Sequence, residues 1–146
     1  MFTDGAADVG VVDDAVQEIA GWGAIFLAET VGQEDSQLEW LGALWGPVCV
    51  AVDDPAFLGA ERATSPVAEH SGALAVLKLI ARIMPDTAEV VLMIDASHTV
   101  DVVNFECAVR QNRCLAKSVR VAVEALRLQR RVRCYKISGH SGIPGN

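Results

Sequence analysis

The stretch AEVVLMIDAS at residues 88–97 constrains the fold most, because it places a continuous apolar run directly before an aspartate. A short run of this kind, rich in branched aliphatic residues, predicts a strand that is buried on both faces. We therefore expect it near the centre of a sheet. A buried carboxylate is costly without a partner or a cation, so Asp95 at the end of this strand is a candidate functional residue.

The other segments predict three strands, then a helix, then alternating strands and helices. Pro66 suits the first turn of the first helix, with Ser65 as its N-cap. The expected strands lie around Phe2 and at residues 21–29, 38–52, 88–97 and 131–138, with 8–20 as a long connection, and the expected helices at 67–84, 98–109 and 110–130. This order predicts one α/β domain over residues 1–146, with a mixed five-stranded sheet and helices on both faces.

Composition excludes several classes of protein. Apolar residues make up 51% of the chain, which argues against disorder. No uncharged apolar run reaches about 18 residues, so we expect no membrane span. The N-terminus carries acids where a secretory signal would carry basic residues. The four cysteines show no CxxC pairing, which favours free thiols of an intracellular protein.

Charge is distributed very unevenly along the sequence. Residues 1–61 contain twelve acids and no lysine or arginine, whereas residues 110–136 contain nine basic residues and one acid. The net charge of -7 would argue against a nucleic-acid partner, but phosphate binding depends on the local field. The basic block is therefore either a phosphate-binding surface or a solvated helix face.

Three carboxylates are candidates for a shared site. Asp4 ends a short strand, Glu69 lies in the first turn of a helix, and Asp95 ends the apolar strand. Glu69 could also simply stabilise the helix through a favourable interaction with its dipole. If the three meet, a divalent cation such as Mg²⁺ would relieve their repulsion. Two such ions could activate a water and stabilise the leaving oxygen of a phosphodiester.

Five motifs occur in an order and spacing that resemble type I ribonuclease H, most closely the ribonuclease H domains of non-LTR retrotransposons. They are FTDGAA (2–7), GWGAIF (21–26), AEHSGALAVL (68–77), MIDAS (93–97) and GHSGIPGN (139–146). The resemblance implies a ribonuclease H-like fold and hydrolysis of the RNA strand of RNA/DNA hybrids by two Mg²⁺ ions, for which Mn²⁺ can substitute. It also implies that such a domain can be part of a reverse-transcriptase polyprotein.

Carried over to these positions, the resemblance implies roles for ten residues. Asp4, Glu69 and Asp95 match three of the four metal-binding carboxylates, and His140 matches a loop histidine that assists proton transfer or release. The expected nucleic-acid contacts are Gly5, Ser65, Arg113, Lys117, Arg120 and Asn146. His70 and His98 are expected to be helix-surface or partly buried residues without a catalytic role.

The sequence also departs from the resemblance. Ser65 and Pro66 stand where relatives commonly have asparagine, Ala96 follows Asp95 where many have serine, and residues 8–20 are long and acidic. The fourth aspartate and its C-terminal helix would follow the final loop, so we expect a chain truncated before them. Two alternatives to a nuclease remain open: a non-catalytic module that binds hybrids, and a decayed fragment that folds poorly.

Overall fold

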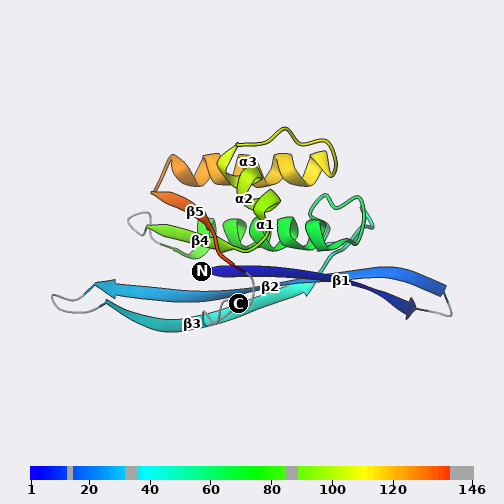
Figure 1. Cartoon of the computed structure of the whole chain (residues 1–146), viewed down its shortest axis with the longest axis horizontal. Coiled ribbons are helices and arrows are strands. Elements are labelled where there is room, and N and C mark those ends of the chain that lie inside the picture. Colours follow the sequence, from blue (N-terminus) through cyan, green and yellow to red (C-terminus); the bar gives the residue numbers. More distant parts are fainter. Residues whose placement is uncertain (13–14, 32–35, 85–88, 139–146) are drawn as a thin grey trace.

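A five-stranded mixed sheet forms the centre of the computed structural model, which describes residues 1–12, 15–31, 36–84 and 89–138. The strand order is β3-β2-β1-β4-β5 (Figure 1). The first three strands pair antiparallel, while β4 pairs parallel with both β1 and β5. Their bounds are Phe2–Val12, Ala15–Val31, Ser36–Pro47, Val90–Ile94 and Val132–Lys136. The predicted sheet is confirmed.

Three helices, α1 (Ser65–Ile83), α2 (Ser97–Asn104) and α3 (Arg113–Arg127), pack against this sheet. Val90, Leu92 and Ile94 of β4 point into the core, as do Val132 and Cys134 of β5. These side chains meet buried residues of all three helices, which therefore cover one face of the sheet, as Figure 1 shows, and not both faces as predicted. The helix expected after the final loop falls outside the described residues.

The helical stripes expected from the sequence form the core between α1 and α3. Val119, Val123 and Leu126 of α3 are fully buried, as are Leu74 and Leu77 of α1. Burying one such side chain stabilises the fold by about 1.5–3 kcal/mol. No helix among the described residues has the length and hydropathy needed to cross a membrane.

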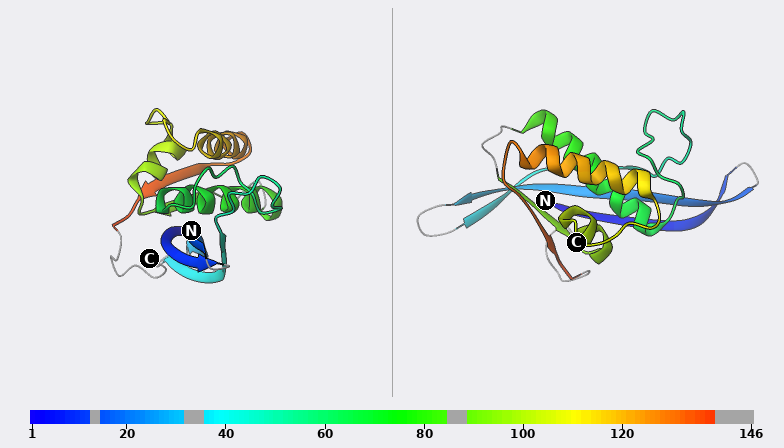
Figure 2. Two further views of the ribbon diagram at one scale, coloured as in Figure 1. Left: turned by 90° about the vertical axis from the view of Figure 1, so that its right-hand side faces the viewer. Right: turned by 90° about the horizontal axis from the view of Figure 1, so that it is seen from above.

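The structure corrects the prediction that residues 8–20 form a long connection. β1 continues to Val12 and β2 begins at Ala15, so most of this segment belongs to one ladder that runs from Phe2↔Ile25 to Val12↔Ala15. Figure 2 shows the resulting hairpin extending well beyond the helices. Glycine and alanine have low strand propensity, so FTDGAADVG gives little local signal for a strand that its pairing partner stabilises.

Element ends differ from the predictions for local reasons. β3 ends at Pro47, which has no N–H to donate to a ladder. Thr64, rather than the predicted Ser65, takes the N-cap position of α1. The two later helices are shorter than predicted, because Phe105 ends α2 and Asn112 precedes α3 in left-handed conformations with φ of 65° and 49°.

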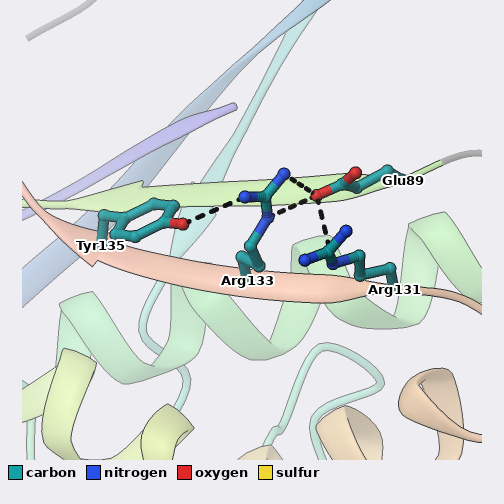
Figure 3. Close-up of polar contacts among 4 residues, drawn as sticks. All are labelled: Glu89, Arg131, Arg133 and Tyr135. Carbon is teal, nitrogen blue, oxygen red and sulfur yellow. Dashed lines mark hydrogen bonds and ion pairs between the residues drawn. The ribbon is translucent and has the colours of Figure 1, made fainter.

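The edge strand β5 carries a small ionic network on the sheet face that the helices leave uncovered. Arg133 forms an ion pair with Glu89, and a nitrogen of Arg131 lies 3.9 Å from the same carboxylate (Figure 3). Arg133 also donates to the hydroxyl of Tyr135. Charged side chains on an edge strand hinder pairing with another chain. Two cations of the basic block therefore already have a partner in Glu89.

Candidate active site

Asp4, Glu69 and Asp95 converge beside the C-terminal end of the central strand β4, as the sequence predicted. One carboxylate oxygen from each lies within 4.8 Å of those of the other two. They come from β1, the second turn of α1 and the residue after β4, so Glu69 lies one turn further into the helix than predicted. A cavity of about 360 Å³ opens onto them and is lined by Asp4, Gly5, Ser65, Pro66, Glu69, Asp95, Ala96, Ser97, His98 and Thr99.

Gly5 allows β1 and α1 to approach closely enough to form this cluster. A Cβ atom at this position would lie 2.5 Å from the backbone nitrogen of Glu69 and 2.8 Å from Ala68. No side chain fits in that space. The Gly5 N–H donates to Asp4 Oδ1 at 2.8 Å and to Glu69 Oε1 at 2.9 Å. One backbone donor therefore orients two of the three carboxylates, while the hydroxyl of Ser65 donates to the Gly5 carbonyl oxygen.

The electrostatics of the cluster favour a bound cation. Glu69 is only 5% exposed. Burial, followed by the negative charge of Asp95, raises the pKa of Glu69 to about 8, although the Gly5 N–H opposes this shift. Glu69 Oε2 and Asp95 Oδ1 are buried and have no hydrogen-bond partner within the described residues. Buried acceptor oxygens without a partner are costly, and hard oxygen donors suit Mg²⁺, so the residues fit a divalent ion.

Comparison with solved structures agrees with this architecture. RNase H1 from the halophilic archaeon Halobacterium salinarum NRC-1 superposes with a TM-score of 0.58 at 16% identity, over 94% of this chain and 83% of that one. The N-terminal RNase H domain of a Mycobacterium tuberculosis protein superposes with a TM-score of 0.55 at 21% identity. The match covers 94% of this chain and 83% of that one. The fold is that of ribonuclease H. No protein-family model and no curated protein matches the sequence.

A viral protease–reverse transcriptase also superposes on this chain. The Prototype Foamy Virus protease–reverse transcriptase matches with a TM-score of 0.62 at 16% identity, over 99% of this chain and 18% of that one. This chain therefore corresponds to a small part of that larger protein. At these identities the similarity establishes the architecture, while the chemistry depends on the side chains described here.

Two histidines pack against each other near the carboxylates, and one of them lines their cavity. His70 is 4% exposed, more buried than we expected. Its Nδ1 lies 2.5 Å from the carbonyl oxygen of Pro66, which can only accept, so this nitrogen carries the proton. Burial lowers the pKa of His70. The ring of His98 packs edge-on against that of His70, with 5.2 Å between the ring centres. His98 also lines the cavity, a placement that the sequence did not predict.

The basic residues of α3 have unequal surroundings. Arg113 and Lys117 are exposed. The guanidinium of Arg120, in contrast, donates to the carbonyl oxygens of Val102 and Cys107 and lies 5.2 Å from the centre of the Phe105 ring. Arg120 therefore holds the segment between α2 and α3 in place. The predicted nucleic-acid contacts of these three residues stay predictions, and His140 and Asn146 lie outside the described residues.

Proposed function

We propose that this chain is a metal-dependent ribonuclease that hydrolyses the RNA strand of RNA/DNA hybrids. One observation carries the proposal. Three carboxylates meet at the end of a central strand of a ribonuclease H fold, and two of their buried oxygens have no hydrogen-bond partner among the described residues. A structural ion pair would have supplied a lysine or arginine here, yet the described residues that line the cavity include neither. The arrangement supports a site whose positive charge comes from solution.

Asp4, Glu69 and Asp95 would hold the metal, which we propose to be two Mg²⁺ ions that Mn²⁺ can replace. Bound ions would supply positive charge for the phosphate and lower the pKa of a water. Glu69 is buried and oriented by the Gly5 N–H, so it anchors the site from within. Asp4 is exposed and faces the cavity, where it can reach an arriving backbone. The proposed hydrolysis breaks the bond from phosphorus to O3′ and leaves a 5′-phosphate and a 3′-hydroxyl.

The proposed partner is an RNA/DNA hybrid duplex. Arg113 and Lys117 are free to contact phosphates, and such contacts would make binding depend strongly on salt. Recognition of RNA requires contact with the 2′-hydroxyl. Ser65 and Gly5 line the cavity and are candidates for that contact. The similarity to the foamy-virus chain supports the further proposal that the domain works within a reverse-transcriptase polyprotein.

Cleavage of an end-labelled RNA/DNA hybrid with Mg²⁺ or Mn²⁺ tests this function. We expect RNA products from the wild type and none from Asp95→Asn. Asp53→Asn is a matched control, because Asp53 is an exposed acid outside the cluster. Cleavage that survives Asp95→Asn would overturn the site assignment. A folded wild type that binds the hybrid without Mg²⁺ and yields no product would instead support the non-catalytic binding module.

A further inference from the structure

A tryptophan lies in the same row of the sheet as the metal-site carboxylate of Asp4. The ladders pair Asp4 with Gly23 and Gly23 with Trp45. Side chains of directly paired residues point to the same face of a sheet. At about 4.8 Å between neighbouring strands, the Cα atoms of Asp4 and Trp45 are about 10 Å apart. Trp45 is 76% exposed.

A shallow cavity of about 200 Å³ connects these two residues. It is lined by Phe2, Asp4, Gly23, Ala24, Ile25, Ala43, Leu44 and Trp45. Gly23 lies between the carboxylate and the indole, and a Cβ built on it would meet no atom within 4 Å. The space above Gly23 is therefore open. Asp4 lines this cavity as well as that of the carboxylate cluster, so the two cavities adjoin at this residue.

The backbone that carries Trp45 is held firmly from the other face of the sheet. Trp22 packs against the core under the next residue, Gly46, where an added Cβ would lie 3.0 Å from the Trp22 ring. Trp22 also contacts Gly72 of α1. The exposed indole therefore stands on a strand whose position is fixed by packing against α1, the helix that supplies Glu69.

The charge of this region restricts what can bind beside Trp45. Residues 1–61 contain twelve acids and no lysine or arginine, so this part of the chain has no side chain that could pair with a phosphate. An aromatic face can instead hold a nucleobase by stacking, which requires no positive charge. Bases inside a duplex are covered by their neighbours on both faces. An unpaired base offers a free face to Trp45, whereas in a blunt duplex only the outer side of each terminal base pair is uncovered.

We propose that Trp45 stacks on an unpaired nucleobase next to the carboxylate cluster, so that the protein prefers hybrids with a single-stranded extension. This inference rests on the proposed function and specifies its substrate further. The phosphate lies at Asp4, and the base of a nearby unpaired nucleotide occupies the cavity over Gly23. Trp45 acts in binding and takes no part in the bond-breaking step.

A comparison of two labelled hybrids tests the proposal. One is a blunt 12-base-pair RNA/DNA hybrid, and the other carries four unpaired nucleotides at each end of its DNA strand. Binding is measured by fluorescence anisotropy in Ca²⁺, a hard cation that oxygen ligands accept, with gels to confirm intact RNA. We expect the wild type to bind the extended hybrid about tenfold more tightly, the effect of one stacked base.

Variants of the two exposed tryptophans of β3 show whether the preference for the extended hybrid depends on Trp45. Trp45→Ala should remove it, and Trp45→Phe should keep most of it because a ring remains. Trp40→Ala is the matched control: Trp40 is 59% exposed, pairs with Leu27 and does not line the cavity. This variant should bind like the wild type. Circular dichroism and thermal melting of each variant check that the fold is intact.

The outcomes separate the stacking site from the proposed function. A wild type without preference, or a preference that persists in Trp45→Ala, overturns the stacking site, and cleavage of the blunt hybrid in Mg²⁺ would still support the nuclease. A preference that depends on Trp45 in a protein without cleavage supports the stacking site and contradicts the nuclease. A folded wild type that neither binds nor cleaves either hybrid contradicts both.

Discussion

Two acidic sites lie at opposite ends of β4 and differ in how their negative charge is neutralised. Glu89, just before β4, is partnered by Arg131 and Arg133 of the chain itself. Asp95, just after β4, and Glu69 have no cationic partner among the described residues, and each keeps a buried oxygen without a hydrogen bond. The first site is complete as folded. At the second, burial and mutual repulsion make the ionised carboxylates unfavourable unless a cation binds.

The largest expected effect is on cleavage. Glu69→Gln keeps the shape of the side chain and its contact with the Gly5 N–H but removes the charge. We expect at least about a hundredfold loss of hybrid cleavage, because the ligand charge that holds the metal is lost. Rates are measured under single-turnover conditions in Mg²⁺. Glu89→Gln, at the partnered site, should cleave at the wild-type rate, and equal losses in both would contradict the distinction.

Gly5→Ala should disrupt the unpartnered site by steric means. The added methyl group would lie 2.5 Å from the backbone of Glu69, so β1 and α1 must move apart. We expect a loss of about 3 kcal/mol in the free energy of unfolding, as for overpacking in a core, together with loss of cleavage. Urea unfolding measures the first quantity. At Gly23, where the same methyl group meets open space, Gly23→Ala should cost much less.

Protonation should distinguish the two sites in the metal-free protein. The pKa of Glu69 rises from about 4.5 in the unfolded chain to about 8 in the folded one. The folded state therefore retains a proton that the unfolded state has lost between these pH values. Stability should fall as pH rises from 4.5 towards 8, by at most about 1.4 kcal/mol per pH unit.

Thermal melting in EDTA at pH 5, 6.5 and 8 measures this slope, with Glu69→Gln as the reference. The difference between the two proteins should grow with pH, and Glu69→Gln should be the more stable at pH 8. Saturating Mg²⁺ should remove most of the difference, because the cation favours the ionised carboxylate. Melting curves that stay parallel across the pH range would show that Glu69 keeps an ordinary pKa.

The smallest effect is expected at the partnered site. Glu89→Gln breaks the ion pair that Figure 3 shows, but the arginines are exposed and water can solvate them. Exposed pairs contribute little to stability. The melting temperature should therefore stay within experimental error of the wild type at low salt. A clear decrease would mean that the edge strand β5 depends on this pair.

Local patterns predicted the elements whose signal is strong within one segment. The apolar run of β4 and the stripes of α1 and α3 are examples, because burial there follows directly from periodicity. The extension of the β1–β2 hairpin into residues 8–20 was missed, because pairing between the strands, rather than a local sequence pattern, stabilises it. Arg120 was predicted to contact nucleic acid, and its spacing on α3 did not reveal its hydrogen bonds to the carbonyl groups of Val102 and Cys107.

The candidate site was only partly accessible from the sequence. Motif order brought Asp4, Glu69 and Asp95 together, and the structure agrees. The role of Gly5 depends on a close approach between residues 64 positions apart, and the row from Asp4 to Trp45 depends on two strand registers. Register is set by long-range packing, so neither feature could be deduced from local spacing.

The parallel pairing of β1 with β4 also determines when the metal site forms during folding. Phe2 pairs with Met93, so this contact must close a loop of about 90 residues, whereas the hairpin of β1 and β2 needs only its neighbours. Non-local pairings of this kind form late and slowly. The carboxylates of Asp4 and Asp95 meet only when β1 pairs with β4, so a partly folded chain has no complete metal site. Metal binding should therefore indicate that the chain has reached its native state.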